Sequence, residues 1–161
     1  MSAGRIVLAD PVASRRAIAL ELGASDVIDV TAGPLDEQLR RIMPKGVDGV
    51  LDSSGVVSAI EAGAACLAPC GKLAMVGVPR SLDATLSLNI VQMLSRGISV
   101  CGVTEGDADP QILLPQLISL YREGRFPFDR LVTTYPLAQI NQAIVDQHAG
   151  QCVKVVLTTA E

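Results

Sequence analysis

The chain has 161 residues, of which 49% are hydrophobic, and its formal net charge is -4 at pH 7. This length and this hydrophobic content allow one domain of ordinary size with a substantial buried core. The basic residues are scattered without a run and aromatic residues make up only 2% of the chain, which argues against a nucleic-acid surface. No apolar stretch approaches the roughly 20 residues that a membrane-spanning helix needs.

Short apolar runs alternate with helical patterns along the whole chain. In chain order we expect strand 6–9, helix 15–22, strand 27–30, helix 35–42, strand 49–52, helix 56–68, strands 72–78 and 98–103, helix 109–123, strand 131–135, helix 137–147 and strand 153–157. The strands are continuous apolar runs, which is typical of a parallel sheet covered on both faces. The alternation predicts an α/β fold with a doubly wound, mostly parallel sheet that is Rossmann-like.

Apolar spacing predicts the buried face of three helices. The expected inward residues are Val56, Ile60, Ala64 and Leu67, then Leu114, Leu117, Ile118 and Tyr121, and finally Ile140, Ala143 and Ile144. The helix near 109–123 starts either at Asp109-Pro110 or near Pro115, because an interior proline would kink it. Leu82–Leu88 alternates apolar and polar residues as an edge strand would.

The opening of the chain contains a mismatch. Arg5–Pro11 has the pattern of the second strand of a dinucleotide-binding fold, yet no two of the 14 glycines are two residues apart, so G-x-G-x-x-G is absent. In such folds that glycine loop follows the first strand and holds the pyrophosphate. We therefore expect residues 1–161 to form a single, N-terminally truncated dinucleotide-binding domain that lacks the first βα unit.

Asp10 ends the first predicted strand. Dinucleotide-binding folds carry an acid at this place, which accepts hydrogen bonds from the adenosine ribose and repels the extra phosphate of NADP. An Asp before Pro is also a good helix N-cap, with Pro11 at the first helical position, so both roles stay open. Arg15 lies one helical turn further on and either covers the ribose or adenine or belongs to a solvated helix face.

Three loops follow predicted strands, at the edge where open α/β sheets bind ligands. Asp52–Gly55 offers small residues and a tight turn beside a ligand, or it is an ordinary βα loop. Val76–Pro79 and Gly102–Asp107 end the next two strands, where glycine admits a cofactor ring and the backbone can recognise it. Lys72 and Lys154 are isolated cations that either meet a phosphate or stand on the surface.

The sequence provides no catalytic centre of its own. The cysteines, at positions 66, 70, 101 and 152, include no C-x-x-C pair, and there is one histidine, so the usual zinc-ligand spacing is absent. We expect His148 to complement a helix dipole rather than act as a base. We also expect buried thiols, no metal site, and a cytoplasmic protein with no nucleic-acid or membrane partner.

Several motifs together resemble one family. The series Ile6–Asp10, Leu22–Ala24, Gly46–Asp48, Gly71–Leu73, Val76–Val78 and Lys154–Leu157 is similar to the medium-chain, zinc-dependent alcohol dehydrogenases, and Gly102–Pro110 with Gly124–Leu131 is similar to their aryl (benzyl) alcohol dehydrogenase branch. The resemblance covers nearly all of this chain but less than half of a family member. It implies the cofactor-binding portion of an NAD-dependent enzyme that oxidises a primary alcohol, aromatic in that branch, to an aldehyde by hydride transfer.

The resemblance also implies cofactor-binding roles for particular residues. They are Asp10, Arg15, Ser53, Ser54, Val76, Gly77, Val78, Val103, Glu105 and Lys154. Asp10 and Arg15 would contact the adenosine ribose, with Asp10 favouring NAD over NADP, and the serines would lie near the middle of the cofactor. Residues 76–78 would line the nicotinamide site, with backbone groups of Val76, Val103 and Glu105 reaching the carboxamide. The lysine would contact the pyrophosphate.

The family's zinc ligands, proton-relay residues and glycine-rich turn all lie upstream of Met1 in this resemblance. Zinc is therefore expected only in the full-length family enzyme, and this chain alone is expected to be inactive. The family's dimers join their cofactor domains edge to edge near residues 82–103, so NAD and a second copy are the expected partners.

Loss of the central first strand would expose two inner sheet edges. We expect either that residues 6–9 pair directly with residues 49–52 or that a second copy supplies the contact. Two other functions stay open. One is a non-catalytic Rossmann-like binding or dimerisation module. The other is the cofactor half of a zinc-free quinone or enoyl reductase of the same superfamily, against which Asp10 weighs because those relatives often prefer NADP.

Overall fold

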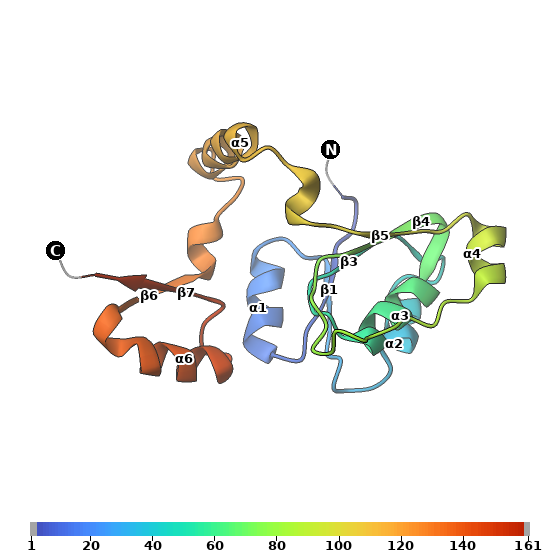
Figure 1. The fold of residues 1–161 in the computed structure, drawn as a ribbon, viewed down its shortest axis with the longest axis horizontal. Helices are drawn as coiled ribbons and strands as arrows, with labels where there is room; N and C mark the ends of the chain where they lie inside the picture. The colour runs from blue at the N-terminus through green and yellow to red at the C-terminus, as the bar shows by residue number, and fades with distance from the viewer. Residues whose placement is uncertain (1–2, 160–161) are drawn as a thin grey trace. The chain divides into compact units, whose positions relative to one another are not determined.

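The computed structural model describes residues 3–159. The chain divides into two compact units, which we name by their place in the sequence (Figure 1). The terminal unit joins residues 1–29 to residues 109–161, and the middle unit is residues 30–108.

The middle unit is built on a three-stranded parallel sheet in the order β3-β4-β5. The strands are β3 (Val47–Asp52), β4 (Leu67–Met75) and β5 (Ser99–Gly102), and the helices are α2 (Leu35–Ile42), α3 (Val57–Ala65) and α4 (Ile90–Arg96). Helix α3 packs against α2, β3 and β4, and α4 packs against β4 (Figure 1). The parallel order brings the carboxyl ends of the three strands to one edge of the sheet.

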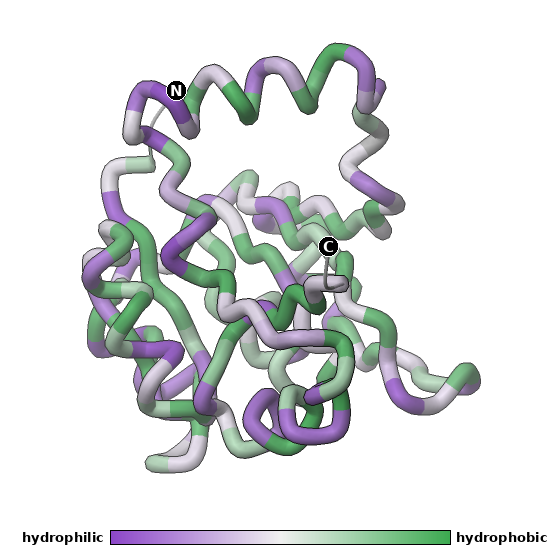
Figure 2. Tube along the Cα trace, turned by 90° about the vertical axis from the view of Figure 1, so that its left-hand side faces the viewer, coloured by the Kyte–Doolittle hydropathy of each residue, from purple (hydrophilic) through white to green (hydrophobic). Residues whose placement is uncertain are grey.

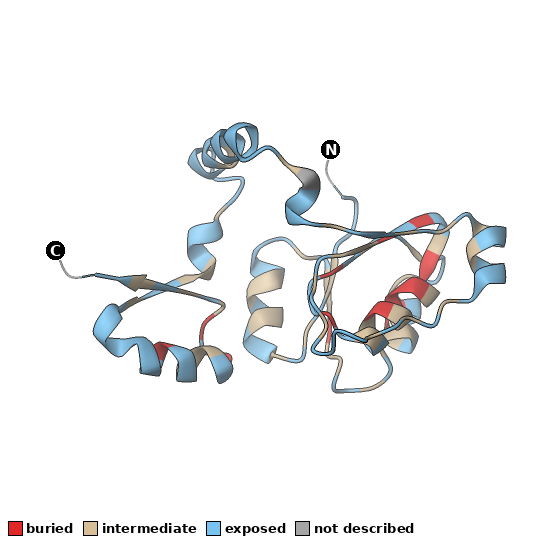
Figure 3. Cartoon of the chain, in the orientation of Figure 1, coloured by how far each residue is buried: buried red, intermediate tan, exposed pale blue. Residues whose placement is uncertain are grey.

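Buried side chains of the middle unit gather on α3 and β4 (Figure 3). Leu67 and Leu73 are fully buried, and Ile60 and Ala64 complete the cluster. Gly63 lets α3 approach β3, because a Cβ there would lie 2.9 Å from a methyl group of Val50. The sequence prediction for this helix was right about Ile60 and Ala64 but wrong about Val56, which is exposed.

Two boundaries in the middle unit differ from the sequence prediction. The expected helix 56–68 ends at Ala65, because Leu67 already belongs to β4. Helix α4 was not predicted, although its ends carry ordinary signals: the Asn89 side chain accepts a hydrogen bond from the Gln92 amide, and Gly97 is left-handed. Its seven residues are too few to display a helical period.

The expected edge strand over residues 82–88 does not form a ladder in the described part of the chain. The alternation itself is present, since Leu86 and Leu88 pack against the core cluster while Ser87 is exposed. Leu82 stands outside the pattern, with 96% of its surface exposed. A strand needs a second strand beside it, and none of the strands within residues 3–159 pairs with this segment.

The terminal unit contains two parallel strand pairs with a helical crossover each. Strand β1 (Val7–Ala9) pairs with β2 (Asp26–Ile28) through α1 (Ala13–Glu21). Strand β6 (Val132–Pro136) pairs with β7 (Lys154–Thr158) through η3 (Leu137–Gln139) and α6 (Ile140–His148). The remaining elements are η1 (Glu105–Asp107) in the middle unit, and α5 (Pro110–Arg122) and η2 (Phe128–Leu131) in this one.

Helix α5 starts at its Asp109 cap, whose side chain accepts a hydrogen bond from the Gln111 amide, and it continues through Pro115. The predicted inner face is wrong for Leu114, Ile118 and Tyr121, which are all at least 40% exposed. Hydrophobic and polar residues mix along this helix (Figure 2). On α6, Ala143 is buried as predicted, whereas Ile140 and Ile144 are exposed. Apolar spacing predicted which residues of α5 and α6 share a face, but it did not predict which of those residues are buried.

The α/β class and the parallel direction of the strands are confirmed for the part of the chain described. The strands form three separate ladders rather than one continuous sheet. No ladder of the described residues joins β1 to β3, so the first alternative, direct pairing of residues 6–9 with residues 49–52, is wrong. The second, that another copy supplies the contact, stays a prediction. Among the described residues, no helix has the length and apolar character to cross a membrane.

Candidate functional site

The turn after β3 is organised by the carboxylate of Asp52, which is only 7% exposed. Its Oδ1 accepts hydrogen bonds from the amide and the hydroxyl of Ser54, at 3.0 and 2.6 Å, and its Oδ2 accepts one from the Gly55 amide at 3.0 Å. The Asp52 carbonyl accepts from the amides of Val76 and Gly77 at 2.8 and 3.0 Å. A buried carboxylate must be satisfied in this way. Asp52 therefore fixes the turns after both β3 and β4.

The two turns approach each other so closely that only glycine fits at their contact. Gly55 has φ +66°, and a Cβ there would lie 2.3 Å from the Val78 carbonyl oxygen. A Cβ on Gly77 would lie 2.2 Å from the Gly55 nitrogen and 2.7 Å from the Ser53 carbonyl carbon. These neighbours are backbone atoms. We call this contact the glycine junction of residues 53–55 and 76–78.

The glycine junction stands at the carboxyl edge of the sheet together with the end of β5. The Val103 amide donates to the Met75 carbonyl at 2.9 Å, which continues the β4–β5 ladder past the end of β5. Ser53, Ser54, Val76 and Val78 are exposed, and Val103 is half-buried. Glu105 is exposed with φ 51°. The structure thus brings the predicted middle-unit residues 53, 54, 76–78 and 103 to one edge, with Glu105 two residues beyond it.

This edge presents backbone groups, two small hydroxyls and two exposed valine side chains. Such a surface can hold a planar apolar ring and recognise polar substituents through the backbone. The Ser54 hydroxyl donates to the Asp52 carboxylate, and the same carboxylate accepts the amides of Ser54 and Gly55, so this pair holds the turn together. The edge is suited to binding a ligand through its backbone and small side chains.

In the terminal unit, the two carboxylate oxygens of Asp10 have different neighbours. Oδ1 accepts a hydrogen bond from the Val12 amide at 2.7 Å, which closes a turn just before α1. Oδ2 lies 3.8 Å from the Arg15 guanidinium. The Arg15 Nε is buried and has no hydrogen-bond partner in the described part of the molecule. The predicted helix-capping role of Asp10 is wrong, because the N-cap of α1 is Val12 and no side chain caps it. The turn engages Oδ1 only.

Arg16 supports this corner, and the sequence prediction missed it. Its guanidinium donates to the Asp10 carbonyl at 2.7 Å and to Asp29 Oδ2 at 2.6 Å, so it joins the segments that follow β1 and β2. Arg16 is the less exposed of the two neighbouring arginines, at 15% against 36% for the Arg15 side chain. The sequence feature that could have indicated this role is the acid after each of the two strands, Asp10 and Asp29.

Lys154 begins β7 opposite Val132 and is exposed. The structure brings Asp10 and Arg15 together, at 3.8 Å. His148 stands exposed in the last turn of α6, where a cation complements the helix dipole.

The four cysteines are free thiols, and the expectation that they are buried holds for half of them. Cys66 and Cys152 are buried, whereas Cys70 and Cys101 are exposed. Burial raises the pKa of the Cys66 thiol above its usual value and keeps it protonated. In the region that the structure describes, no three or more His, Cys, Asp or Glu side chains gather as metal ligands would.

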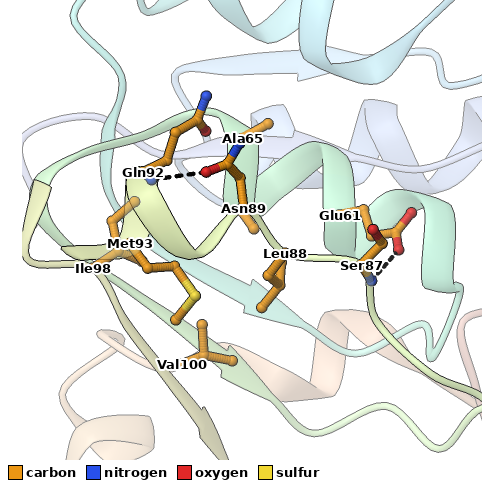
Figure 4. A pocket seen from close by; sticks show the side chains of 10 residues that line it. Glu61, Ala65, Ser87, Leu88, Asn89, Gln92, Met93, Ile98 and Val100 are labelled. Atoms are coloured by element: carbon orange, nitrogen blue, oxygen red, sulfur yellow. Dashed lines mark hydrogen bonds between the residues drawn. The ribbon is translucent and has the colours of Figure 1, made fainter. Parts of the chain in front are cut away.

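A small hollow of about 150 Å³ lies beside α3, α4 and the start of β5 (Figure 4). The polar groups at its rim form hydrogen bonds with other residues of the rim. Glu61 accepts one from the Ser87 amide at 2.7 Å, and Asn89 accepts one from the Gln92 amide at 2.9 Å. Met93 and Val100 supply its apolar side. None of the predicted cofactor residues lines this hollow.

A parallel α/β arrangement with small residues at the strand ends and an acid after a further strand defines a dinucleotide-binding protein. Comparison with known families makes this specific. The family model described as "Zinc-binding dehydrogenase" matches residues 1–122, and the chain belongs to this family. Dehydrogenases of this family use NAD(P) as the cofactor.

Relatives with known names agree with the resemblance seen in the sequence. Geraniol dehydrogenase of Castellaniella defragrans is 40% identical over 98% of this chain. The crystal structure of benzyl alcohol dehydrogenase from Acinetobacter calcoaceticus superposes with a TM-score of 0.93 at 34% identity, over 99% of this chain. An alcohol dehydrogenase zinc-binding domain protein from Burkholderia ambifaria gives 0.93 at 39%, also over 99%.

The chain spans 42% of the length of the geraniol dehydrogenase and 44% and 43% of the two solved chains. In these alcohol dehydrogenases the matched part is the cofactor-binding half. The predicted family and the predicted Rossmann-like fold are both confirmed.

Proposed function

We propose that this chain is the NAD-binding portion of a zinc-dependent alcohol dehydrogenase that oxidises a primary alcohol to an aldehyde. The observation that carries the proposal is the glycine junction, which holds an exposed backbone edge at the carboxyl ends of parallel strands in a member of the zinc-binding dehydrogenase family. NAD would supply the acceptor for the hydride of the alcohol. The chain's own residues would bind and orient it.

The arrangement around Asp10 supports NAD over NADP. Oδ2 is not engaged by the turn before α1 and can accept hydrogen bonds from vicinal ribose hydroxyls. A 2′-phosphate at the same place would meet the negative charge of the carboxylate. Arg15, 3.8 Å away, would neutralise that charge only in part, because more than a third of its side chain is in solvent.

The exposed edge of the middle unit fits the nicotinamide end. Val76 and Val78 are 46% and 78% exposed, so a planar ring that covered them would remove apolar surface from water. The backbone of Val76, Val103 and Glu105 would recognise the carboxamide. Ser53 and Ser54 would contact the middle of the cofactor, and Lys154 would add a cation for the pyrophosphate.

The named relatives support a substrate class. Geraniol and benzyl alcohol are both primary alcohols whose carbinol carbon is attached to an unsaturated carbon, and proteins named for them match nearly the whole chain. We therefore propose an allylic or benzylic primary alcohol. The zinc ion and the alcohol pocket would come from the rest of a full-length enzyme.

Further parts of the proposal concern assembly and location. We propose that residues 1–161 form a single dinucleotide-binding domain, that the protein is cytoplasmic, and that two copies associate through residues 82–103. Helix α4 supports the last point, because Ile90, Val91 and Leu94 are each more than 70% exposed. Light scattering of the purified chain tests it, and a stable monomer at high concentration would contradict association.

Calorimetric titration of the chain with NAD and with NADP tests the cofactor. We expect heat with NAD and much weaker binding of NADP. Asp10→Asn keeps an oxygen that can accept the Val12 amide hydrogen bond, so it should weaken NAD binding by about tenfold and reduce the preference for NAD over NADP. Asp129→Asn, which removes the same charge from an exposed site, is the control and should leave both affinities unchanged.

Two results would count against the proposal. If Asp10→Asn and Asp129→Asn lowered NAD affinity equally, Asp10 would not contact the ribose. If the folded chain released no heat at about 1 mM NAD, a non-catalytic binding or dimerisation module would become the better description of this polypeptide.

A further inference from the structure

A second hollow, of about 280 Å³, lies at the opposite end of the middle unit's sheet from the glycine junction. Gly46, which precedes β3, and Cys66, which precedes β4, both line it. Its walls also carry the cations Arg40, Lys45 and Arg96. No predicted cofactor residue lines this hollow, so it is a separate feature of the molecule.

The charge around this hollow is unusual for the chain. The protein is acidic overall, with a net charge of -4, yet three cations and no carboxylate are among the described lining residues. One carboxylate is nearby, because Arg40 pairs with Asp36 at 3.0 Å. The cations therefore exceed the acids by two at this place.

The three cations differ in how far they are already engaged. Arg40 pairs with Asp36, and a guanidinium nitrogen of Arg96 donates to the Leu67 carbonyl. Lys45 has no ion pair among the residues of the described range. Each guanidinium keeps further N–H donors beyond these bonds.

Helix dipoles explain only some of this charge. α2, α3 and α4 all end near the hollow, and basic residues in a last helical turn complement the carbonyl end of a helix. Arg40 and Arg96 occupy such places. Lys45 does not, because it follows Pro44 beyond the end of α2. Lys45 is therefore the lining cation that neither an ion pair nor a last helical turn accounts for in the described range.

We propose that this hollow, which we call the basic hollow, binds a phosphate group, either free or as a phosphate monoester. Guanidinium groups offer paired donors that match phosphate oxygens, and the lysine ammonium adds a point charge. The Gln92 side chain on the same wall supplies a neutral donor. The volume equals that of about nine water molecules, which leaves room for a phosphate with part of its hydration or of an attached group.

The test is calorimetric titration of the full chain with inorganic phosphate, at constant ionic strength in chloride. We expect binding with a dissociation constant in the millimolar range. Lys45→Gln removes the cation that no described group pairs, so it should weaken phosphate binding by about tenfold without unfolding the protein. Its NAD affinity should not change, because Lys45 lies at the opposite end of the sheet from the glycine junction.

Arg41→Gln is the matched control. Arg41 lies on the same helix as Arg40 and carries the same charge, but it pairs with Glu37 at 3.8 Å and does not line the basic hollow. We expect this variant to bind phosphate like the parent chain. Equal weakening by Lys45→Gln and Arg41→Gln would overturn the proposal in favour of diffuse surface charge, as would the absence of heat at about 10 mM phosphate.

A second titration with glycerol phosphate separates the two sources of the phosphate. Tighter binding of the monoester, lost again in Lys45→Gln, would identify a phosphorylated metabolite as the ligand class. Binding of inorganic phosphate alone would identify the free ion. Since these readouts use phosphate and Lys45, failure of this inference would leave the proposed NAD site untouched.

Discussion

Gly77→Ala tests whether the glycine junction determines the shape of the cofactor edge. The added methyl carbon would lie 2.2 Å from the Gly55 nitrogen, whereas an ordinary contact begins at 3.4 Å, so the two turns would have to separate by about 1 Å. The obstructing atoms are backbone, and they are held by the hydrogen bonds of Asp52. Overpacking of this kind costs about 3 kcal/mol.

Urea unfolding followed by circular dichroism measures this cost. With a slope of about 2 kcal/mol per molar urea, the midpoint should fall by about 1.5 M. Gly102→Ala is the control, because Gly102 ends the neighbouring strand β5 and an added Cβ there has nothing within 4 Å. NAD binding should weaken in Gly77→Ala at temperatures where it is still folded. If both variants unfolded at the same urea concentration, the close contact of the two turns would be refuted.

Three further substitutions probe other parts of the structure. Asp52→Asn replaces Oδ2, which accepts a hydrogen bond from the Gly55 amide, with an NH₂ group that cannot accept one. The free energy of unfolding should fall by about 2 kcal/mol in the same urea assay. Leu73→Ala empties a fully buried position and should cost about 3 kcal/mol, while the heat of NAD binding per folded molecule stays unchanged. The hydrogen bond to Asp146 raises the pKa of Tyr135 to about 12, so Asp146→Asn should move the phenolate absorbance to lower pH. Because this pKa is raised on folding, the bond stabilises the fold below about pH 10, the ordinary tyrosine value, and its contribution disappears as the pH rises through 12. An unchanged titration in Asp146→Asn would show that the bond does not form in solution.

Local signals in the sequence predicted most of the elements. The helix over Leu35–Ile42 was predicted at its observed limits, because prolines stand on both sides of it. The end of α3 was placed too late, since Leu67 falls on the apolar stripe of the helix and no glycine or proline intervenes before Pro69. What decides the boundary is the pairing of Leu67 with Val47 in the sheet, which is a contact between segments distant in sequence.

For the candidate site too, the sequence predicted the features set by local pattern and missed those set by contacts between distant segments. Asp10 and the loops after the strands could be predicted, because strand ends are where such folds bind ligands. The roles of Asp52 and Arg16 could not, since each depends on partners brought together by the fold: the backbone of residues 76 and 77 for one, and Asp29 for the other. The sequence pattern indicated where the candidate site residues lie, but it did not indicate which groups hold them in place.

The two carboxylate oxygens of Asp10 have different neighbours, and this restricts which substitutions could occur at position 10 during evolution. On the ribose-binding role proposed for Asp10, a lineage that came to use NADP would have to give up the negative charge there. It would still need an acceptor for the Val12 amide, which one oxygen now provides. Asparagine, serine and threonine meet that need, whereas alanine or a branched aliphatic residue would leave that amide without its acceptor. Substitutions of Asp10 that change the cofactor preference are thus limited to short polar side chains.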